Sequence, residues 1–453
     1  MKVHLIAIGG SAMHNLAIAL HRKGFRVTGS DDEIVEPSRS RLDACGLLPD
    51  RIGWDAACIA RDLDAVIVGM HARGDNPELL RAQELGLKIY SYPEYLYEQT
   101  REKTRVVIGG SHGKTSITAM ILHVAEVAGL ETDFMVGAQL AGFDCMVRLS
   151  ETARFAILEG DEYLSSPTDL RPKFHLYKPD IALISGIAWD HINVFPTYAN
   201  YVEQFRIFAG LITSGGTLVY CEPDEEVCRV AETAREDIRK VPYRTHAHVI
   251  RDGVTCLLTE GGEVPILVFG RHNLQNLSGA LEVCRCMGIP DRTFYAAIST
   301  FSGAARRLEL VRRSAHTAVY KDFAHSPSKL RATTAALREQ YPARRLVACM
   351  ELHTFSSLND QFLSEYKGSM ESADLALVYF NPQTIAHKKL KPISPEQVRV
   401  AFGSDKVEVF TSSEGLVNRL RQLNWHDANL LLMTSGTFDG MDFNRLASEL
   451  AGD

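Results

Sequence analysis

The chain contains 453 residues, of which 45% are hydrophobic and 23% are charged, and its formal net charge is −7. These values are typical of a globular protein with two or three domains, and the negative charge argues against a broad nucleic-acid-binding surface. The start of the chain has no signal-peptide pattern, and no apolar run is long enough to span a membrane. The nine cysteines are scattered along the chain. We therefore expect a cytoplasmic protein with reduced thiols and with no membrane or nucleic-acid partner.

The first hundred residues alternate short apolar runs with amphipathic segments. Strands are predicted at 3–8, 25–28 and 65–69, and a helix at 13–20. This alternation is typical of a parallel, doubly wound sheet. The charged and polar stretch 97–105 is expected to link this unit to the next, so we place the first domain at residues 1–100.

The rest of the chain continues the alternation in two further domains, which we place at residues 101–303 and 304–453. In the second domain, strands are predicted at 106–108, 157–159, 181–185 and 217–220, and helices at 117–128 and 270–287. The segment 241–270 has the turns of a β-rich excursion. In the third domain, strands are predicted at 317–323, 345–350, 375–379, 407–410 and 430–434. The sequence therefore predicts an α/β protein with three domains.

A glycine-rich segment, VVIGGSHGKTS at 106–116, joins a predicted strand to a predicted helix. Successive backbone N–H groups at such a turn, together with the helix N-terminus, form a cradle for phosphate. The expected nucleotide-binding residues are Gly110, Ser111, His112, Gly113, Lys114, Thr115 and Ser116. Lys114 would reach the β- and γ-phosphates, and the Thr115 hydroxyl would bind Mg²⁺. The alternative is an ordinary glycine-rich turn with a solvated lysine, which the strand–loop–helix context disfavours.

Six sequence blocks, in the same order, resemble those of the Mur ligases. The blocks are GGSHGKTS at 109–116, EGDEY at 159–163, WDH at 189–191, GRHNLQN at 270–276, ARRLE at 305–309 and DFAHSP at 322–327. The resemblance implies a Rossmann-like UDP-binding domain, a central P-loop ATPase domain and a C-terminal Rossmann-like domain. It also implies an ATP-dependent ligase that forms carbon–nitrogen bonds in peptidoglycan metabolism, through an acyl-phosphate.

The resemblance also assigns roles to individual residues. It implies that Thr115, Glu159 and His191 bind a metal ion, either Mg²⁺ or Mn²⁺. It implies nucleotide contacts by Asn276, Arg307 and Asp322. It also implies catalytic roles for Lys114, Arg307 and His325. From the residues alone, a carboxylate at the end of a strand suits Mg²⁺, whereas histidine is a poor ligand for that ion. The residues alone therefore favour a hydrogen-bonded structural role for His191, and only the resemblance places it at the metal. Likewise, Arg307 could simply pair with Glu309. No lysine occurs in 193–207 to hold a second metal, so the number of metals stays open.

The first turn of the chain, AIGGSAM at 7–13, resembles the loop with which UDP-muramate ligases hold UDP phosphates. The resemblance implies substrate contacts by Gly9, Gly10, Ser11, Asp31 and His71. Read as a dinucleotide fingerprint, the turn is a weak match, and a purely structural turn remains an alternative. A nicotinamide-dependent oxidoreductase is disfavoured because it would leave the Lys114 block unexplained.

Two branches of the family begin in this way. One attaches L-alanine to UDP-N-acetylmuramate, and the other attaches the tripeptide L-Ala-γ-D-Glu-meso-diaminopimelate to it. The segments 69–77, 159–174 and 434–440 resemble the tripeptide-attaching branch, whereas 351–355 partly resembles the alanine-attaching one. We therefore expect UDP-N-acetylmuramate and the tripeptide as substrates, with L-alanine as the alternative acceptor. An ATP-gated binding module is a more distant alternative, which the later blocks disfavour.

Overall fold

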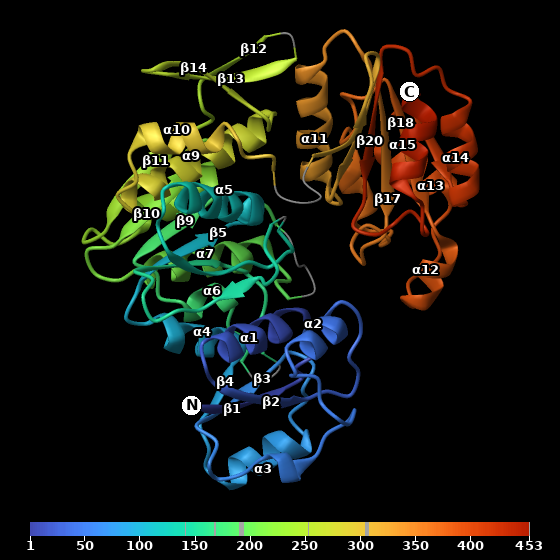
Figure 1. Ribbon diagram of the computed structural model, residues 1–453. Helices are drawn as coiled ribbons and strands as arrows, with labels where there is room; N and C mark the ends of the chain where they lie inside the picture. Colours follow the sequence, from blue (N-terminus) through green and yellow to red (C-terminus); the bar gives the residue numbers. More distant parts are fainter. Residues whose placement is uncertain (141, 167–168, 190–193, 252, 304–307, 453) are drawn as a thin grey trace. The chain divides into compact units, whose positions relative to one another are not determined.

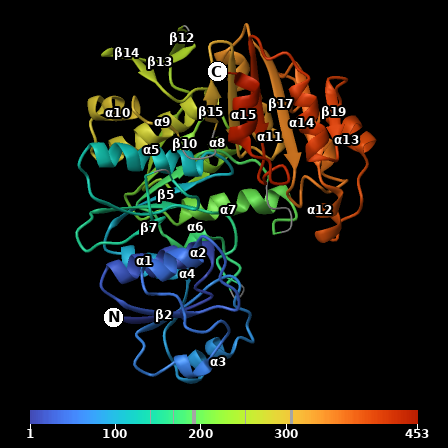
Figure 2. The ribbon, with the colours of Figure 1, turned by 45° about the vertical axis from the view of Figure 1, so that its right-hand side comes forward.

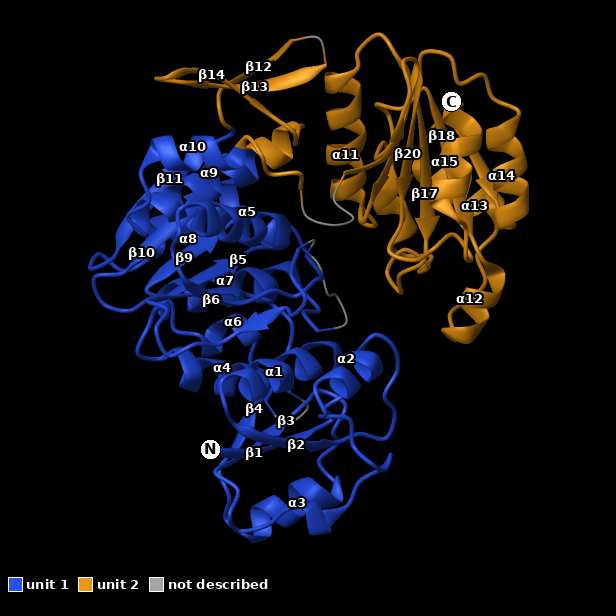
Figure 3. Cartoon of the chain, viewed as in Figure 1, with its two compact units in different colours: residues 1–245, 275–298 blue, residues 246–274, 299–453 orange. Residues whose placement is uncertain are grey.

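The computed structural model describes residues 1–453 except 141, 167–168, 190–193, 252, 304–307 and 453. The chain is mixed α/β and separates into two compact units (Figure 3). Unit 1 comprises residues 1–245 and 275–298, and unit 2 comprises residues 246–274 and 299–453. Among the described residues, none of the helices has the length and apolar character that crossing a bilayer requires.

Unit 1 begins with a four-stranded parallel sheet in the order β2-β1-β3-β4 (Figure 1). Its strands are β1 (Lys2–Ile6), β2 (Arg26–Ser30), β3 (Ala65–Val68) and β4 (Ile89–Ser91). Its helices are α1 (Ser11–Arg22), α2 (Ser38–Ala44), α3 (Pro77–Glu84) and α4 (Tyr92–Thr100), with a short 3₁₀ turn at Ala56–Cys58. The doubly wound arrangement expected from the alternating apolar runs is confirmed.

The expected linker at 97–105 is wrong, because helix α4 continues to Thr100 and strand β5 (Thr104–Gly109) begins four residues later. A capping box starts this helix: the Ser91 side chain accepts from the backbone of Glu94, whose carboxylate accepts in return from Ser91. The helix buries Tyr95 and Leu96 on one face. Its polar residues therefore belong to a half-buried helix face, which resembles a linker in sequence.

The second sheet of unit 1 has seven strands in the order β11-β10-β9-β5-β8-β6-β7, with β5 in the middle. All its neighbouring strands are parallel except the pair β6 and β7. The other strands are β6 (Thr132–Met135), β7 (Val147–Arg148), β8 (Phe155–Glu159), β9 (Ile181–Ile184), β10 (Thr217–Cys221) and β11 (Arg239–Tyr243). The helices are α5 (Lys114–Val127), α6 (Lys173–Leu176), α7 (Tyr198–Gly210), α8 (Glu225–Thr233), α9 (Arg271–Cys286) and α10 (Asp291–Ile298).

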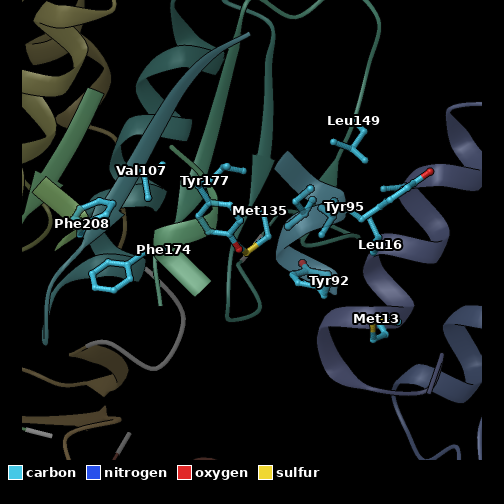
Figure 4. Packing of buried hydrophobic residues seen from close by; sticks show 14 of the residues in the cluster. Met13, Leu16, Tyr92, Tyr95, Val107, Met135, Leu149, Phe174, Tyr177 and Phe208 are labelled. Carbon is cyan, nitrogen blue, oxygen red and sulfur yellow. The ribbon is translucent and has the colours of Figure 1, made fainter. Parts of the chain in front are cut away.

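The two sheets of unit 1 share one hydrophobic core. Figure 4 shows Met13 and Leu16 of α1, Tyr92 of α4, Met135 of β6 and Tyr177, which follows α6, within that cluster. The Asn15 side chain adds a polar link, since its Oδ1 accepts a 2.8 Å hydrogen bond from the backbone of Met146. The boundary predicted at residue 100 therefore falls inside a packed unit, and it stays a prediction, as does the boundary at 303.

Unit 2 contains a three-stranded antiparallel sheet and a six-stranded sheet (Figure 1, Figure 2). The small sheet consists of β12 (His248–Arg251), β13 (Val254–Thr259) and β14 (Gly262–Ile266). The β-rich excursion expected at 241–270 is thus present, although its first residues belong to β11 and the second sheet of unit 1. The large sheet has the order β15-β16-β20-β17-β18-β19, with only β15 antiparallel to its neighbour.

The large sheet of unit 2 is covered by helices on both faces. Its strands are β15 (Glu309–Arg313), β16 (Thr317–Asp322), β17 (Arg345–Leu352), β18 (Leu375–Phe380), β19 (Val407–Phe410) and β20 (Ala428–Met433), and its helices are α11 (Pro327–Gln340), a 3₁₀ turn at Leu363–Tyr366, α12 (Pro382–His387), α13 (Pro395–Phe402), α14 (Ser413–Arg421) and α15 (Phe443–Ala451). Alternate residues of one strand enter different cores: Ala348 packs with α11 and α13, and Val347 packs with α14 and α15. This is the period-two pattern of a sheet buried on both sides.

Candidate active site

The loop between β5 and α5 depends on two glycines that other residues cannot replace without strain. Gly110 and Gly113 have φ values of +128° and +81°, which L side chains rarely adopt. A Cβ atom at Gly110 would collide with Ser185, and one at Gly113 would collide with the side chain of Asn276. The structure therefore brings Asn276 of α9 beside the predicted phosphate loop, as expected for a nucleotide contact. Gly113 also caps the N-terminus of α5, where unpaired N–H groups and the helix dipole favour an anion.

Lys114, the first residue of α5, is held in the loop by two short contacts. Its Nζ donates to the carbonyl of Gly110 at 2.7 Å and to Glu162 Oε2 at 2.7 Å. Burial alone would lower the pKa of Lys114, but the charges of Glu162, Asp161 and Glu159 outweigh burial, so its pKa is raised and the ammonium stays charged. The loop thus presents a fixed positive charge at a helix N-terminus.

Thr115 and Glu159 meet where α5 starts and β8 ends. Thr115 Oγ1 donates to Glu159 Oε1 at 2.8 Å, and Glu159 Oε2 accepts from the backbone of Gly137 at 2.9 Å. Glu159 is only 4% exposed, and burial, together with the nearby charge of Asp161, raises its pKa. A hydroxyl and a carboxylate side by side form an oxygen-only donor set, which suits Mg²⁺. The residues present therefore fit the expected ion.

The third expected metal ligand, His191, lies outside the described residues, as does Arg307. The segment that leads to His191 is nevertheless tied to the phosphate loop through Ser111. The backbone N–H of Ser111 donates to the carbonyl of Gly186, and Ser111 Oγ accepts from the backbone of Ala188 at 2.9 Å. The loop and this segment therefore hold one another in place.

Three further residues contact the loop or its lysine, and the motif reading gave them no role. They are Glu162, Ser185 and Tyr201. Ser185 Oγ donates to the carbonyl of His112, and Tyr201 OH lies 2.8 Å from Ser111 Oγ. Glu162 could have been recognised from its place in the EGDEY block, three residues after Glu159. The other two contacts depend on tertiary structure, since β9 and α7 reach the loop only in the folded chain.

The N-terminal turn is built around Gly9 and Asp31. The N–H of Gly9 donates to Asp31 Oδ2 at 2.7 Å, and a Cβ atom at Gly9 would come within 2.9 Å of the same oxygen. Burial of Asp31 raises its pKa. Asp31 therefore fixes the turn. If Asp31 also binds a ribose hydroxyl, as expected, its carboxylate must accept hydrogen bonds from both the Gly9 backbone and the ribose. Gly10 and Ser11 follow at the start of α1, with Gly10 as its N-cap.

His71, the remaining residue predicted to contact the UDP-sugar, is exposed in the turn that follows β3. That turn starts at Gly69, where a Cβ atom would lie 3.1 Å from Ala7. The His71 turn and the N-terminal turn are therefore neighbours at the carboxyl ends of β1 and β3. This is the edge at which parallel α/β sheets bind their ligands.

In unit 2, Asp322 ends β16 and organises the backbone around it. Its carboxylate accepts from the backbone N–H of Leu308 at 2.5 Å and of Ala324 at 2.7 Å. His325 lies in the turn that follows, where its Nδ1 is 2.8 Å from the carbonyl of Phe323 and its own carbonyl accepts from the Tyr366 hydroxyl at 2.6 Å. Both residues therefore occupy a rigid turn at the carboxyl end of the large sheet.

Three family models match consecutive parts of the chain. The Mur ligase family catalytic domain matches residues 2–104, the Mur ligase middle domain residues 108–284, and the Mur ligase glutamate ligase domain residues 306–436. The UDP-N-acetylmuramate–L-alanine ligase of Burkholderia ambifaria is 31% identical over 383 residues, covering 80% of this chain and 79% of the relative. That of Arthrobacter sp. is 30% identical over 387 residues, covering 83% and 80%. The chain belongs to the Mur ligase family.

Solved Mur ligase structures share the fold over most of the chain. A murein peptide ligase from Psychrobacter arcticus is 22% identical with a TM-score of 0.63, covering 100% of this chain and 99% of that one. The UDP-N-acetylmuramate:L-alanyl-γ-D-glutamyl-meso-diaminopimelate ligase from Neisseria meningitides is 25% identical with a TM-score of 0.60, covering 66% and 98%. The UDP-N-acetylmuramate–alanine ligase from Thermotoga maritima is 19% identical with a TM-score of 0.68, covering 97% of both chains.

These findings confirm three predictions from the sequence. This Mur ligase has the family's three-domain α/β fold, it is an ATP-dependent ligase that forms carbon–nitrogen bonds, and it belongs to peptidoglycan and cell-wall biosynthesis. An oxidoreductase and a binding module without catalysis are thereby overturned as alternatives.

Proposed function

We propose that this Mur ligase joins the tripeptide L-Ala-γ-D-Glu-meso-diaminopimelate to UDP-N-acetylmuramate. The observation that carries the choice of acceptor is the run at 159–174, which resembles the peptide-attaching branch without a gap. In its described part, Arg171 forms ion pairs with Asp169 at 2.7 Å and with Glu94 of α4 at 3.3 Å. The likeness to a solved tripeptide ligase at 25% identity supports the same choice.

The proposed reaction is a phosphoryl transfer followed by an acyl transfer. The lactyl carboxylate of UDP-N-acetylmuramate attacks the γ-phosphate of ATP, which gives an acyl-phosphate and ADP. The α-amine of the tripeptide then attacks the acyl carbon, and phosphate leaves as the amide bond forms. Catalysis of this kind relies on positioning and on preorganised positive charge.

The described residues provide that positioning in specific ways. Lys114 and the N–H groups at the start of α5 bind the phosphates, and Asn276 contacts the nucleotide from α9. Thr115 and Glu159 are the described residues that would hold Mg²⁺, which would neutralise charge that develops on the phosphates. Arg307, His191, Asp322 and His325 keep the roles that their motifs assign. At the N-terminal turn, Gly9, Gly10, Ser11, Asp31 and His71 are proposed to bind the UDP-sugar.

A product analysis tests the proposed acceptor. The protein is incubated with ATP, Mg²⁺ and UDP-N-acetylmuramate and is offered either the tripeptide or L-alanine, and the product is weighed by mass spectrometry. We expect a product that has gained the whole tripeptide. A product that gains only alanine, with no tripeptide adduct, contradicts the proposal.

The second candidate is L-alanine ligation, which two observations favour. The curated relatives at 30–31% identity are named UDP-N-acetylmuramate–L-alanine ligases. The segment ELHTF at 351–355 also partly resembles that branch. In the structure, however, Glu351 is buried, and its carboxylate accepts from the Thr434 hydroxyl and from the backbone N–H of Phe438. It thus fixes the turn after β20, in the segment 434–440 that resembles the peptide-attaching branch.

A further inference from the structure

The buried ion pair between Lys114 and Glu162 places a second carboxylate, besides Glu159, at the phosphate loop, and the motif gave this carboxylate no role. Glu162 is 2% exposed, and its Oε2 lies 2.7 Å from the Lys114 ammonium. The same ammonium also donates to the Gly110 carbonyl at 2.7 Å. Two of its three N–H groups are therefore directed at protein oxygens, in the loop where phosphate is expected to bind.

Glu162 is anchored independently of Lys114. Its other oxygen, Oε1, accepts from the Tyr201 hydroxyl at 3.3 Å. Tyr201 belongs to α7, is fully buried, and its hydroxyl also lies 2.8 Å from Ser111 Oγ. The Glu162 carboxylate can therefore stay with α7 when the Lys114 ammonium turns towards another anion.

A carboxylate that contacts the phosphate-binding ammonium competes with phosphate for it. In a buried site this competition is strong, because water screens little of the repulsion between the two anions. We propose that Glu162 is a positioning residue that acts as a placeholder anion: it holds Lys114 across the loop before nucleotide binds, and nucleotide phosphate then takes its place on that ammonium. This proposal rests on the proposed phosphate-binding role of Lys114.

The variant Glu162→Gln tests the proposal, because glutamine keeps the shape and an oxygen acceptor but lacks the charge. ADP binding to the full-length protein is measured by calorimetry in the presence of EDTA, which leaves the nucleotide free of metal. We expect binding about 5- to 10-fold tighter than in the unchanged protein, and a lower KM for ATP with kcat changed less than about threefold. Unchanged or weaker ADP binding overturns the proposal, since a merely structural ion pair would give that result.

Glu203→Gln is the control, because it removes the same charge from α7, the helix of Tyr201, at an exposed residue that pairs with Arg206 at 3.5 Å. We expect less than about a twofold change in ADP affinity. Equal tightening in both variants would assign the effect to general charge and overturn the placeholder role. Glu162→Asp keeps the charge and should not tighten ADP binding. If Glu162→Gln does not fold, Glu162→Ala replaces it, and tighter ADP binding is again expected.

Lys114→Ala separates failure of this proposal from failure of the proposed function. If Lys114→Ala loses ADP binding and Glu162→Gln does not bind ADP more tightly, only the placeholder role is contradicted. Unchanged ADP binding in Lys114→Ala instead sinks the assignment of the phosphate loop.

Discussion

Thr115 Oγ1 donates a 2.8 Å hydrogen bond to Glu159 Oε1, so the first turn of α5 and the end of β8 present two oxygen ligands side by side. The carboxylate is buried and is held from its other side by the backbone of Gly137. Such support fixes the direction in which a ligand points before an ion arrives.

Replacing Glu159 with glutamine should therefore weaken the response to Mg²⁺. The variant loses the anionic ligand but keeps the hydrogen-bond geometry, so we expect kcat/KM for ATP to fall at least about tenfold, with partial recovery at high Mg²⁺. ADP release is measured against Mg²⁺ concentration. Glu131→Gln at the surface is the control, and an unchanged Mg²⁺ response in Glu159→Gln would remove Glu159 from the metal site.

Replacing Lys114 with alanine should strongly reduce turnover while leaving UDP-sugar binding intact. The Lys114 ammonium is the positive charge at the start of α5. Loss of one hydrogen-bond donor that stabilises a transition state typically lowers kcat by about 10²- to 10³-fold. Product formation and calorimetric titration with UDP-N-acetylmuramate measure the two effects. Turnover at the rate of the unchanged protein would refute the loop assignment.

Replacing Gly9 with alanine should weaken binding of the UDP-sugar without affecting binding of ADP. The new Cβ atom would lie 2.9 Å from both Asp31 Oδ2 and Ile34, so the N-terminal turn must shift. We expect the KM for UDP-N-acetylmuramate to rise about tenfold or more, because a shift costing 1.4 kcal/mol already gives that factor. Gly210→Ala, at the end of α7 with no positive φ and no neighbouring atom within 4 Å of the new Cβ, is the control for loss of glycine. Equal substrate KM values in both variants would argue for a purely structural turn.

Replacing Tyr201 with phenylalanine should loosen the phosphate loop from α7. The ring keeps its packing against Phe195 and Phe205, but Ser111 and Glu162 lose a buried partner. We expect about 1–3 kcal/mol less stability and several-fold weaker ADP binding. Chemical denaturation and calorimetry measure both quantities. Tyr198→Phe on the same helix removes only an exposed hydroxyl with a long, 3.4 Å hydrogen bond to the Ile187 carbonyl, so it should change neither quantity. A Tyr201→Phe variant that matches it would contradict the loop–helix link.

Most strands of this protein were predictable because they are short apolar runs in a regular α/β alternation, as β5, β8 and β20 illustrate. Thr115 and Glu159 were predictable as partners because both follow strands of one parallel sheet, whose carboxyl ends lie at one edge. Ser185 and Tyr201 were not, because a lone serine or tyrosine carries no spacing signal until β9 and α7 pack beside the loop. The expected linker at 97–105 was wrong because the half-buried polar face of α4 has the polar composition of a linker.

The core shared by the two sheets of unit 1 has a consequence for dissecting the protein. A fragment that ends at residue 100 would expose Met13, Leu16 and Tyr92 to water. The Asn15 side chain would also lose its hydrogen bond from the Met146 backbone. Exposed apolar surface of that kind promotes aggregation. The segment of the first sheet is therefore expected to melt in one cooperative step with the segment of the second sheet, and to be obtained in folded form only together with it.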